Sequence, residues 1–231
     1  MNTNRLRMPL DILMTILSVI LMGGTMLFPD DRIHQICGIA LSVLWAVHVV
    51  FNRRWYGSLF KGKYQPFRIM QLVVNCEVLI CALLLMLSGL LMAWFIPADW
   101  VGAALGFART THLIASHWYY IFMAFHIGLH AAKIGRIALQ SSTSSATQNS
   151  REASSSVKII ILRIICIIIS LYGIYAFIIR GVLKYMFGLQ QFFFFDFNRG
   201  YVLFALDYIS IIFLFGTLSH YIAKLFKRGQ K

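Results

Sequence analysis

The sequence predicts an all-α integral membrane protein with six transmembrane helices. Hydrophobic residues make up 59% of the 231 residues, and the mean hydropathy is +0.74, well above the values of soluble proteins. An α-helix needs about 20 apolar residues to cross a bilayer, and six runs approach that length. They cover residues 10–28, 36–51, 72–96, 113–132, 159–179 and 201–223.

The first four runs predict a four-helix bundle over residues 1–139. The second run is short, and it spans a membrane only if the helix extends back to His34, with the imidazole buried as a ligand. The other three runs are long enough without this extension.

Residues 140–157 separate the bundle from the last two runs. They are rich in Ser and Thr and have almost no large apolar side chain, which predicts a flexible linker. Residues 158–231 then form a two-helix transmembrane hairpin. Its connection, residues 181–199, is rich in phenylalanine and is expected at the membrane interface, where aromatic side chains anchor well.

Lysine and arginine favour one side of this topology. The N-terminal segment, the connections after the second and fourth runs and the C-terminal segment carry most of them. By the positive-inside rule, both termini lie in the cytoplasm. The formal net charge of +13 therefore indicates topology and contact with membrane lipid, and nucleic acid is not an expected partner.

Two histidine pairs with equal spacing are the most specific signal in the chain. His34 and His48 are 14 residues apart, and so are His112 and His126. Fourteen residues of α-helix rise about 21 Å and leave the two side chains only about 40° apart around the axis. Two helices therefore each present two imidazoles on one face, one toward each side of a bilayer core about 30 Å thick.

This arrangement predicts two bis-histidine haem b groups stacked across the membrane. Imidazole is an axial ligand of haem iron, and helical bundles hold cofactors between facing helices. The two helices are predicted to be parallel, so His34 faces His112 near the outer side and His48 faces His126 near the inner side. The four cysteines form no C-x-x-C-H motif, so covalent c-type attachment is not expected.

Two further histidines lie on the fourth run. His130 follows His126 by about one turn on the same face, and it is an alternative inner ligand or a hydrogen-bond partner for a propionate or a quinone. His117 is rotated by about 180° from His126, so it is expected to pack away from the ligand face.

Arginines adjoin both histidine pairs. Arg109 precedes His112, and Arg53 and Arg54 follow His48. Guanidinium groups bind anionic propionates through paired hydrogen bonds, so Arg109 is expected at the outer haem and Arg53 or Arg54 at the inner one. Contact with lipid headgroups is an equal alternative for Arg53 and Arg54.

Carboxylates inside the apolar runs are costly and indicate function. Because quinol oxidation releases protons, Glu77 is a candidate for an inner quinone site and Asp207 for an outer one. A structural ion pair, for example of Asp207 with Arg180 or Arg199, is the favoured alternative. Asp11 is expected among the headgroups without a specific role.

Three segments resemble a known family. HQICGIALSVLWAVHVVFNRRWY (34–56), ARTTHLIASHWYYIFMAFHIGLH (108–130) and YGIYAFIIRGVLKYMFGLQQFFFFDFNRG (172–200) are similar to the flavinylation-associated cytochromes, formerly described as a domain of unknown function (DUF4405). The resemblance implies a subunit of the bacterial inner membrane that passes electrons between the quinone pool and an extracytoplasmic flavoprotein. It also implies the motif histidines, which are His34, His48, His112, His126 and His130.

The predicted function is transmembrane electron transfer through two haems, from membrane quinol to an extracytoplasmic redox partner. Three alternatives stay open: a ferric-reductase-like cytochrome fed from the cytoplasm, a haem or metal transporter, and a structural subunit without a cofactor. No phosphate-binding glycine loop occurs in the sequence, so a flavin or nucleotide domain would come from another polypeptide.

Overall fold

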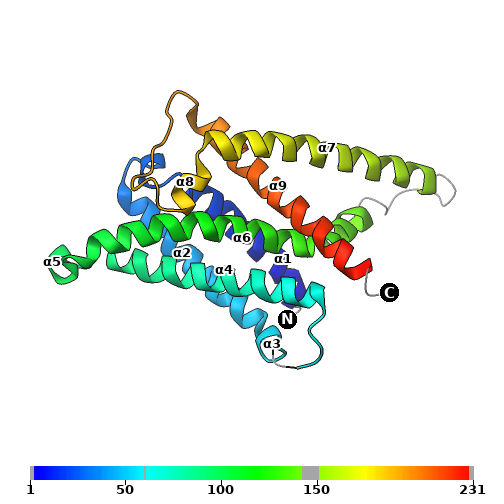
Figure 1. The fold of residues 1–231 in the computed structure, drawn as a ribbon, viewed down its shortest axis with the longest axis horizontal. Helices are drawn as coiled ribbons and strands as arrows, with labels where there is room; N and C mark the ends of the chain where they lie inside the picture. The colour runs from blue at the N-terminus through cyan, green and yellow to red at the C-terminus, as the bar shows by residue number, and fades with distance from the viewer. Residues whose placement is uncertain (1–2, 60, 142–150, 229–231) are drawn as a thin grey trace.

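The computed structural model describes residues 3–59, 61–141 and 151–228, and within these ranges the chain is helical with no strand (Figure 1). Six of the helices described have 19 residues or more: α1 (Thr3–Leu21), α2 (Asp31–Phe51), α4 (Pro66–Leu91), α6 (Ala104–Ser141), α7 (Arg151–Ile179) and α9 (Gly200–Arg228). Shorter helices lie in the connections: η1 (Thr25–Leu27), α3 (Arg53–Tyr56), α5 (Ala98–Val101) and α8 (Val182–Met186).

Four of the long helices have the length and apolar composition needed to cross a membrane. They are α2, α4, the segment Ile160–Ile179 of α7, and α9. Large apolar side chains on their outer surfaces are exposed, as they are on a surface that contacts lipid. The chain is therefore a multi-pass membrane protein.

The other two predicted runs lie in α1 and α6, which do not meet the same criterion over their described residues. In α6 the cause is composition, because four histidines interrupt its apolar sequence. Histidine is polar, and its presence lowers the mean hydropathy of a helix whatever its surroundings in the fold.

The predicted linker is described only at its two ends. Residues 142–150 lie outside the described residues, whereas Gln140 and Ser141 end α6 and residues 151–157 begin α7. α7 therefore starts inside the predicted linker. Apolar residues mark the part of a helix that suits lipid, and the helical backbone continues past that part.

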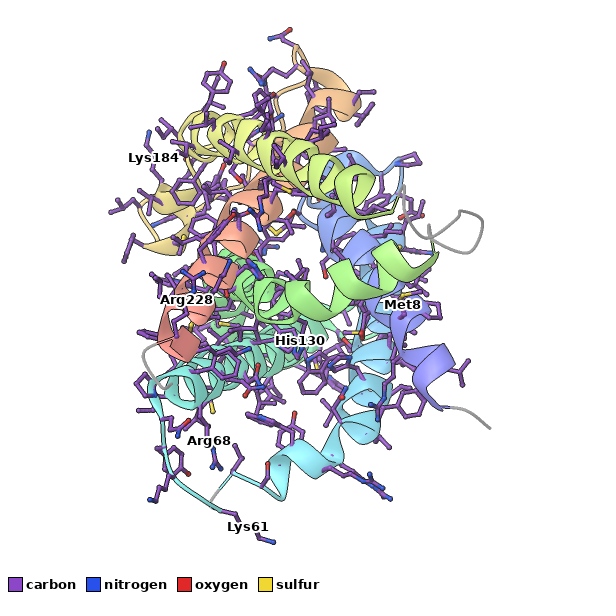
Figure 2. The ribbon with its side chains drawn as sticks, turned by 90° about the vertical axis from the view of Figure 1, so that its right-hand side faces the viewer. Met8, Lys61, Arg68, His130, Lys184 and Arg228 are labelled. Atoms are coloured by element: carbon purple, nitrogen blue, oxygen red, sulfur yellow. The ribbon has the colours of Figure 1, made fainter. Side chains whose placement is uncertain are left out.

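Successive long helices alternate in direction along the molecule (Figure 1). Both ends of the chain lie at the same end of the bundle as α3, while η1, α5 and α8 lie at the opposite end. Figure 2 views the bundle from the end that holds the termini, with Lys61, Arg68 and Arg228 around its edge. The alternation makes α2 and α6 parallel, as predicted.

α9 packs between α6 and α7, and glycines permit both crossings. A Cβ atom on Gly128 of α6 would lie 2.1 Å from the carbonyl oxygen of Gly216 in α9. On the other side, a Cβ atom on Gly173 of α7 would lie 2.4 Å from the carbonyl oxygen of Ser210. Both distances are far inside van der Waals contact, so only glycine lets these backbones approach so closely.

A buried ion cluster joins α7 to α9 and to the connection between them. Asp207 is fully buried, and its carboxylate accepts hydrogen bonds from Arg180 Nε at 2.8 Å, from Arg199 at 3.2 Å and from the Tyr172 hydroxyl at 2.5 Å. The alternative predicted for Asp207, an ion pair with Arg180 or Arg199, is confirmed, and both arginines take part. These bonds engage both carboxylate oxygens, which gives Asp207 a structural role.

The phenylalanine-rich connection is held at the end of the bundle opposite the termini. Phe195 is buried and packs on Phe204 of α9 at 5.3 Å between ring centroids. Phe192, Phe194 and Phe197 are exposed. The buried ring of Phe195 thus holds this segment to the bundle, while the exposed rings are free to anchor it at a membrane interface.

The crossing of α6 and α9 predicts a sharp difference between two glycines of α6. Gly128→Ala should destabilise the bundle by about 1–3 kcal/mol or more, because the new methyl group would overlap the backbone of α9. Gly106→Ala is the matched control, since nothing lies within 4 Å of that position. The measurement is the thermal midpoint of the protein in detergent, and equal midpoints for the two variants would contradict this account of the crossing.

Removing the charge of Asp207 should be strongly destabilising. Asp207→Asn leaves the guanidinium of Arg180 buried without its counter-charge, and breaking such a pair costs about 3–5 kcal/mol. Asp99→Asn, at an exposed position of α5, should leave the thermal midpoint unchanged. A wild-type midpoint for Asp207→Asn would show that the cluster contributes little to stability.

Candidate functional site

The two histidine pairs face each other between α2 and α6. The ring centroids of His34 and His112 are 6.4 Å apart, with 65° between the ring planes. Those of His48 and His126 are 6.3 Å apart, with 72° between the planes. The structure thus brings together the two pairs that equal spacing on parallel helices predicted.

Each separation fits one metal ion between two imidazoles. A bond from an imidazole nitrogen to a transition metal is about 2.0 Å long, and the ring centre lies about 1.1 Å behind that nitrogen. Two imidazoles on opposite sides of one ion therefore have ring centres about 6.2 Å apart.

The composition of each pair indicates which kind of metal it suits. Among the described residues, no group of three or more His, Cys, Asp or Glu side chains is placed to hold a metal ion. Each pair therefore offers two imidazole nitrogens and no third protein ligand among the described residues.

The pair at the end with the chain termini is oriented by oxygen atoms of two neighbouring helices. His48 Nδ1 lies 2.8 Å from Oδ1 of Asp11 in α1. His126 Nδ1 lies 2.8 Å from Oδ1 of Asn75 in α4. A carboxylate oxygen and an amide oxygen are acceptors, so both imidazoles donate from Nδ1.

The opposite pair has weaker orienting contacts. His112 Nδ1 lies 3.1 Å from the hydroxyl of Ser88, and that hydroxyl donates its own proton to the Leu84 carbonyl at 2.6 Å. Ser88 therefore accepts a hydrogen bond from His112. His34 Nδ1 is buried near the backbone of Gly24 and makes no hydrogen bond of standard geometry among the described residues.

Donation from Nδ1 fixes which nitrogen is available to a metal. A neutral imidazole carries one proton, so a ring that donates from Nδ1 presents a lone pair at Nε2. Within the described ranges, Nε2 of His34, His48, His112 and His126 makes no hydrogen bond. An oriented ring with a free Nε2 is the usual state of a metal-binding histidine.

Space beside the rings is compatible with a flat group. No residue of α2 is buried, and α2 packs on α1 rather than on α6. Gly38 follows His34 by about one turn, and nothing lies within 4 Å of the position that its Cβ atom would take. On the other side, a Cβ atom on Gly89 of α4 would lie 3.5 Å from the ring of His112, so glycine leaves room for that ring.

The predicted arginines lie at the surface near the pairs. Arg109 is exposed about one turn before His112, and Arg53 and Arg54 are exposed in α3. In the described part of the chain, none of the three side chains makes a hydrogen bond or an ion pair. Their long side chains are thus available to an anionic group or to lipid headgroups.

Arg7 makes a contact between two helices that no pattern in the sequence predicts. Its guanidinium donates to the carbonyl oxygen of Phe51 at 2.7 Å, which joins the start of α1 to the end of α2. Its Nε is buried without a partner among the described residues. The guanidinium group of Arg7 thus lies near the end of α2 that carries His48.

The other two histidines of α6 have different surroundings. The ring of His130 lies 4.9 Å from that of His126, while the ring that faces His48 at 6.3 Å is that of His126. His117 is only 1% exposed, stacks on Tyr185 of α8 at 4.5 Å and bonds the Leu113 carbonyl through Nδ1. His117 therefore packs away from the two pairs, as predicted.

Sequence analysis missed the residues that orient the imidazoles. Asp11 is half-exposed, as an interfacial residue would be, but the expectation that it lacks a specific role is wrong because it bonds His48. Asn75 and Ser88 carried no signal, since a polar residue in an apolar helix has many explanations. An acidic residue in the first apolar run was the one available clue.

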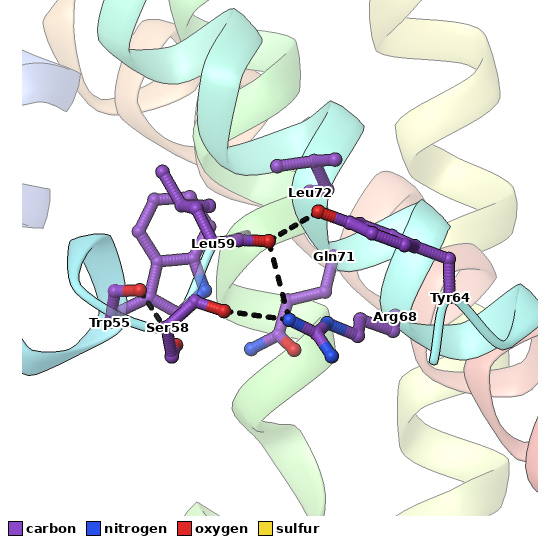
Figure 3. Close-up of a pocket in the computed structure, with 7 residues that line it drawn as sticks. All are labelled: Trp55, Ser58, Leu59, Tyr64, Arg68, Gln71 and Leu72. Carbon is purple, nitrogen blue, oxygen red and sulfur yellow. Dashed lines mark hydrogen bonds between the residues drawn. The ribbon is translucent and has the colours of Figure 1, made fainter. Parts of the chain in front are cut away.

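A separate pocket lies where α3 and the following connection meet α4 (Figure 3). Arg68 bonds the carbonyl of Ser58 at 2.7 Å and stacks on Tyr64, whose hydroxyl bonds the Leu59 carbonyl. The pocket volume of about 110 Å³ is below the range of about 300–1,000 Å³ that is usual for ligand sites. These contacts fold the connection and do not form a cofactor site.

Comparisons of the chain with protein-family models, with curated proteins and with solved structures found no match.

Proposed function

We propose that the protein is a transmembrane electron-transfer cytochrome b with two haem b groups. His34 and His112 would bind one haem, and His48 and His126 the other. The observation that carries this proposal is the pair of facing imidazole couples, with centroid separations of 6.4 and 6.3 Å on two parallel helices. When bound, haem iron supplies one-electron redox chemistry.

The residues around the pairs have defined roles in this proposal. Asp11, Asn75 and Ser88 hold the imidazoles so that Nε2 points to the iron. The rings would lie beside α2, where no residue is buried and the position next to Gly38 is open. Arg109, Arg53 and Arg7 are the guanidinium groups available for propionates at the two ends.

In the proposed topology all six long helices span a bacterial inner membrane, with both termini in the cytoplasm. Their alternating directions and the basic residues at the end with the termini support this orientation. The histidines of α6 would be satisfied by the iron and by neighbouring helices, so they would not oppose insertion. The pair His48–His126 then lies toward the cytoplasm and His34–His112 toward the outside.

The proposed route runs from membrane quinol to an extracytoplasmic partner that carries flavin. Oxidation of one quinol to quinone releases two electrons and two protons, and the electrons pass one at a time. Glu77 lies half-buried in the first half of α4, and in this proposal its carboxylate accepts one of the two protons at the inner side, while the other passes to water at the cytoplasmic surface. Glu77 follows Asn75 by two residues, which places it about 200° around the helix axis from the residue that orients His126. The two histidine pairs lie about 21 Å apart along the helices, as 14 residues of α-helix require.

The haem content of the purified protein tests the proposal. A reduced-minus-oxidised spectrum should show b-type bands with two haems per chain, and His48→Ala and His112→Ala should each lose one. Each variant removes one axial ligand from one pair and leaves the other pair intact. His220→Ala is the control that should keep both haems, because His220 lies in α9, where its ring packs on Tyr221 at 5.5 Å between centroids.

Other results would contradict the proposal in distinct ways. Protein from haem-replete cells with no b-type band would not be a cytochrome. Substoichiometric, exchangeable metal or haem would favour a transporter. Loss of one haem from His130→Ala but not from a His126→Ala variant would assign the inner ligand to His130.

Glu77→Gln should slow quinol oxidation about tenfold or more while leaving both haems in place. The amide keeps the size of the side chain but cannot accept the proton. Stopped-flow reduction of the protein by a quinol analogue measures the rate, and Asp99→Asn is the control for loss of one negative charge. Wild-type rates for Glu77→Gln would exclude it as the proton acceptor.

A further inference from the structure

The two histidine pairs differ in the acceptors that face their Nδ1 atoms. At the end with the termini, His48 meets the Asp11 carboxylate and His126 meets the Asn75 amide oxygen, both at 2.8 Å. At the opposite end, His112 meets a hydroxyl at 3.1 Å, and His34 has no hydrogen bond of standard geometry among the described residues. At the opposite end the backbone carbonyls of Gly24 and Leu85 also lie near His34 and His112, and Asp31 lies close enough to act on His34 through space. The pair at the end with the termini nevertheless differs in having two side-chain oxygens at 2.8 Å, one of which belongs to a carboxylate that bonds an imidazole directly.

Acceptor strength changes the imidazole as a ligand. A stronger acceptor draws the Nδ1 proton away from the ring and makes Nε2 a better electron donor. A better donor stabilises the more positively charged oxidation state of a metal. A carboxylate does so most, because its bond is charge-assisted and its negative charge also acts directly on the metal.

We propose that Asp11, with Asn75, holds the centre at His48 and His126 at a lower reduction potential than the centre at His34 and His112. The inference rests on the proposed function and adds a direction to it. One electron leaves the centre held by His48 and His126, which is oxidised, and reduces the centre held by His34 and His112. No bond forms or breaks, and quinol on one side and an extracytoplasmic flavin on the other are the donor and acceptor.

Other charges near the two pairs act less directly. Arg7 lies at the same end as Asp11, and its positive charge opposes the effect of the carboxylate. Its guanidinium bonds the Phe51 carbonyl, however, and not an imidazole. Asp11 acts through the bond to His48 as well as through space, and its side chain is 53% exposed, so water reaches the rest of the carboxylate.

Redox titration of the haem-loaded protein tests this asymmetry. The His112→Ala background leaves only the centre at His48 and His126, whose potential is then measured alone. Asp11→Asn in this background should raise the potential, and Asn75→Asp should lower it. Each change should alter the equilibrium constant for reduction at least tenfold, which corresponds to about 59 mV for a one-electron couple.

Two further readouts separate the hydrogen bond from a general charge effect. Asp11→Asn should change the electron paramagnetic resonance g values of the oxidised low-spin centre, because the ligand itself has changed. Asp99→Asn, which removes a distant exposed charge, should change neither the g values nor the potential. Asn75→Asp provides an independent measurement if Asp11→Asn fails to load haem.

The outcomes distinguish this inference from the proposed function. Two haems in the wild type with unshifted potentials in both Asp11→Asn and Asn75→Asp would overturn the inference and leave the cytochrome intact. If Asn75→Asp binds haem but Asp11→Asn does not, an unshifted reduction potential in Asn75→Asp overturns the inference as well. Wild-type protein without b haem would overturn both.

Discussion

The absence of water around the helices is the constraint on which the rest of this structure depends. A polar side chain in such a bundle has to find its partner on another helix, because lipid offers none. Asp207 meets two arginines and a tyrosine in this way, and three of the paired histidines meet oxygens from α1 and α4. The polar contacts therefore add specificity to helix neighbours that close glycine crossings and a shared apolar core also hold together.

α6 connects the two halves of the bundle because its faces differ. One face carries the imidazoles that meet α2, and another carries Gly128, where the backbone of α9 approaches most closely. Gly128 follows His126 by two residues, so the crossing with α9 fixes the depth and rotation of that imidazole. The candidate site thus depends on a contact that lies outside it.

The pairing of the histidines could be predicted because it follows from periodicity alone. Equal spacing on two parallel helices determines that His34 meets His112 and that His48 meets His126. The acceptors could not be predicted, since Asp11, Asn75 and Ser88 reach the imidazoles from helices whose rotation no local pattern specifies. Hydropathy identified the long helices but not where α7 starts, because polar residues extend a helix beyond its lipid-facing part. Mean hydropathy alone does not identify α6 as a membrane span, because its four histidines are polar, although their rings have partners within the bundle.

The distance along the chain between facing histidines has a consequence for biosynthesis. His112 follows His34 by 78 residues, and His126 follows His48 by the same interval. Neither couple exists while only the first three long helices have left the ribosome. The hairpin of α1 and α2 must therefore wait, with its imidazoles unmatched, until α6 is synthesised and docks beside α4. The couples can therefore form only once α6 has been synthesised, when α7 and α9 have still to follow.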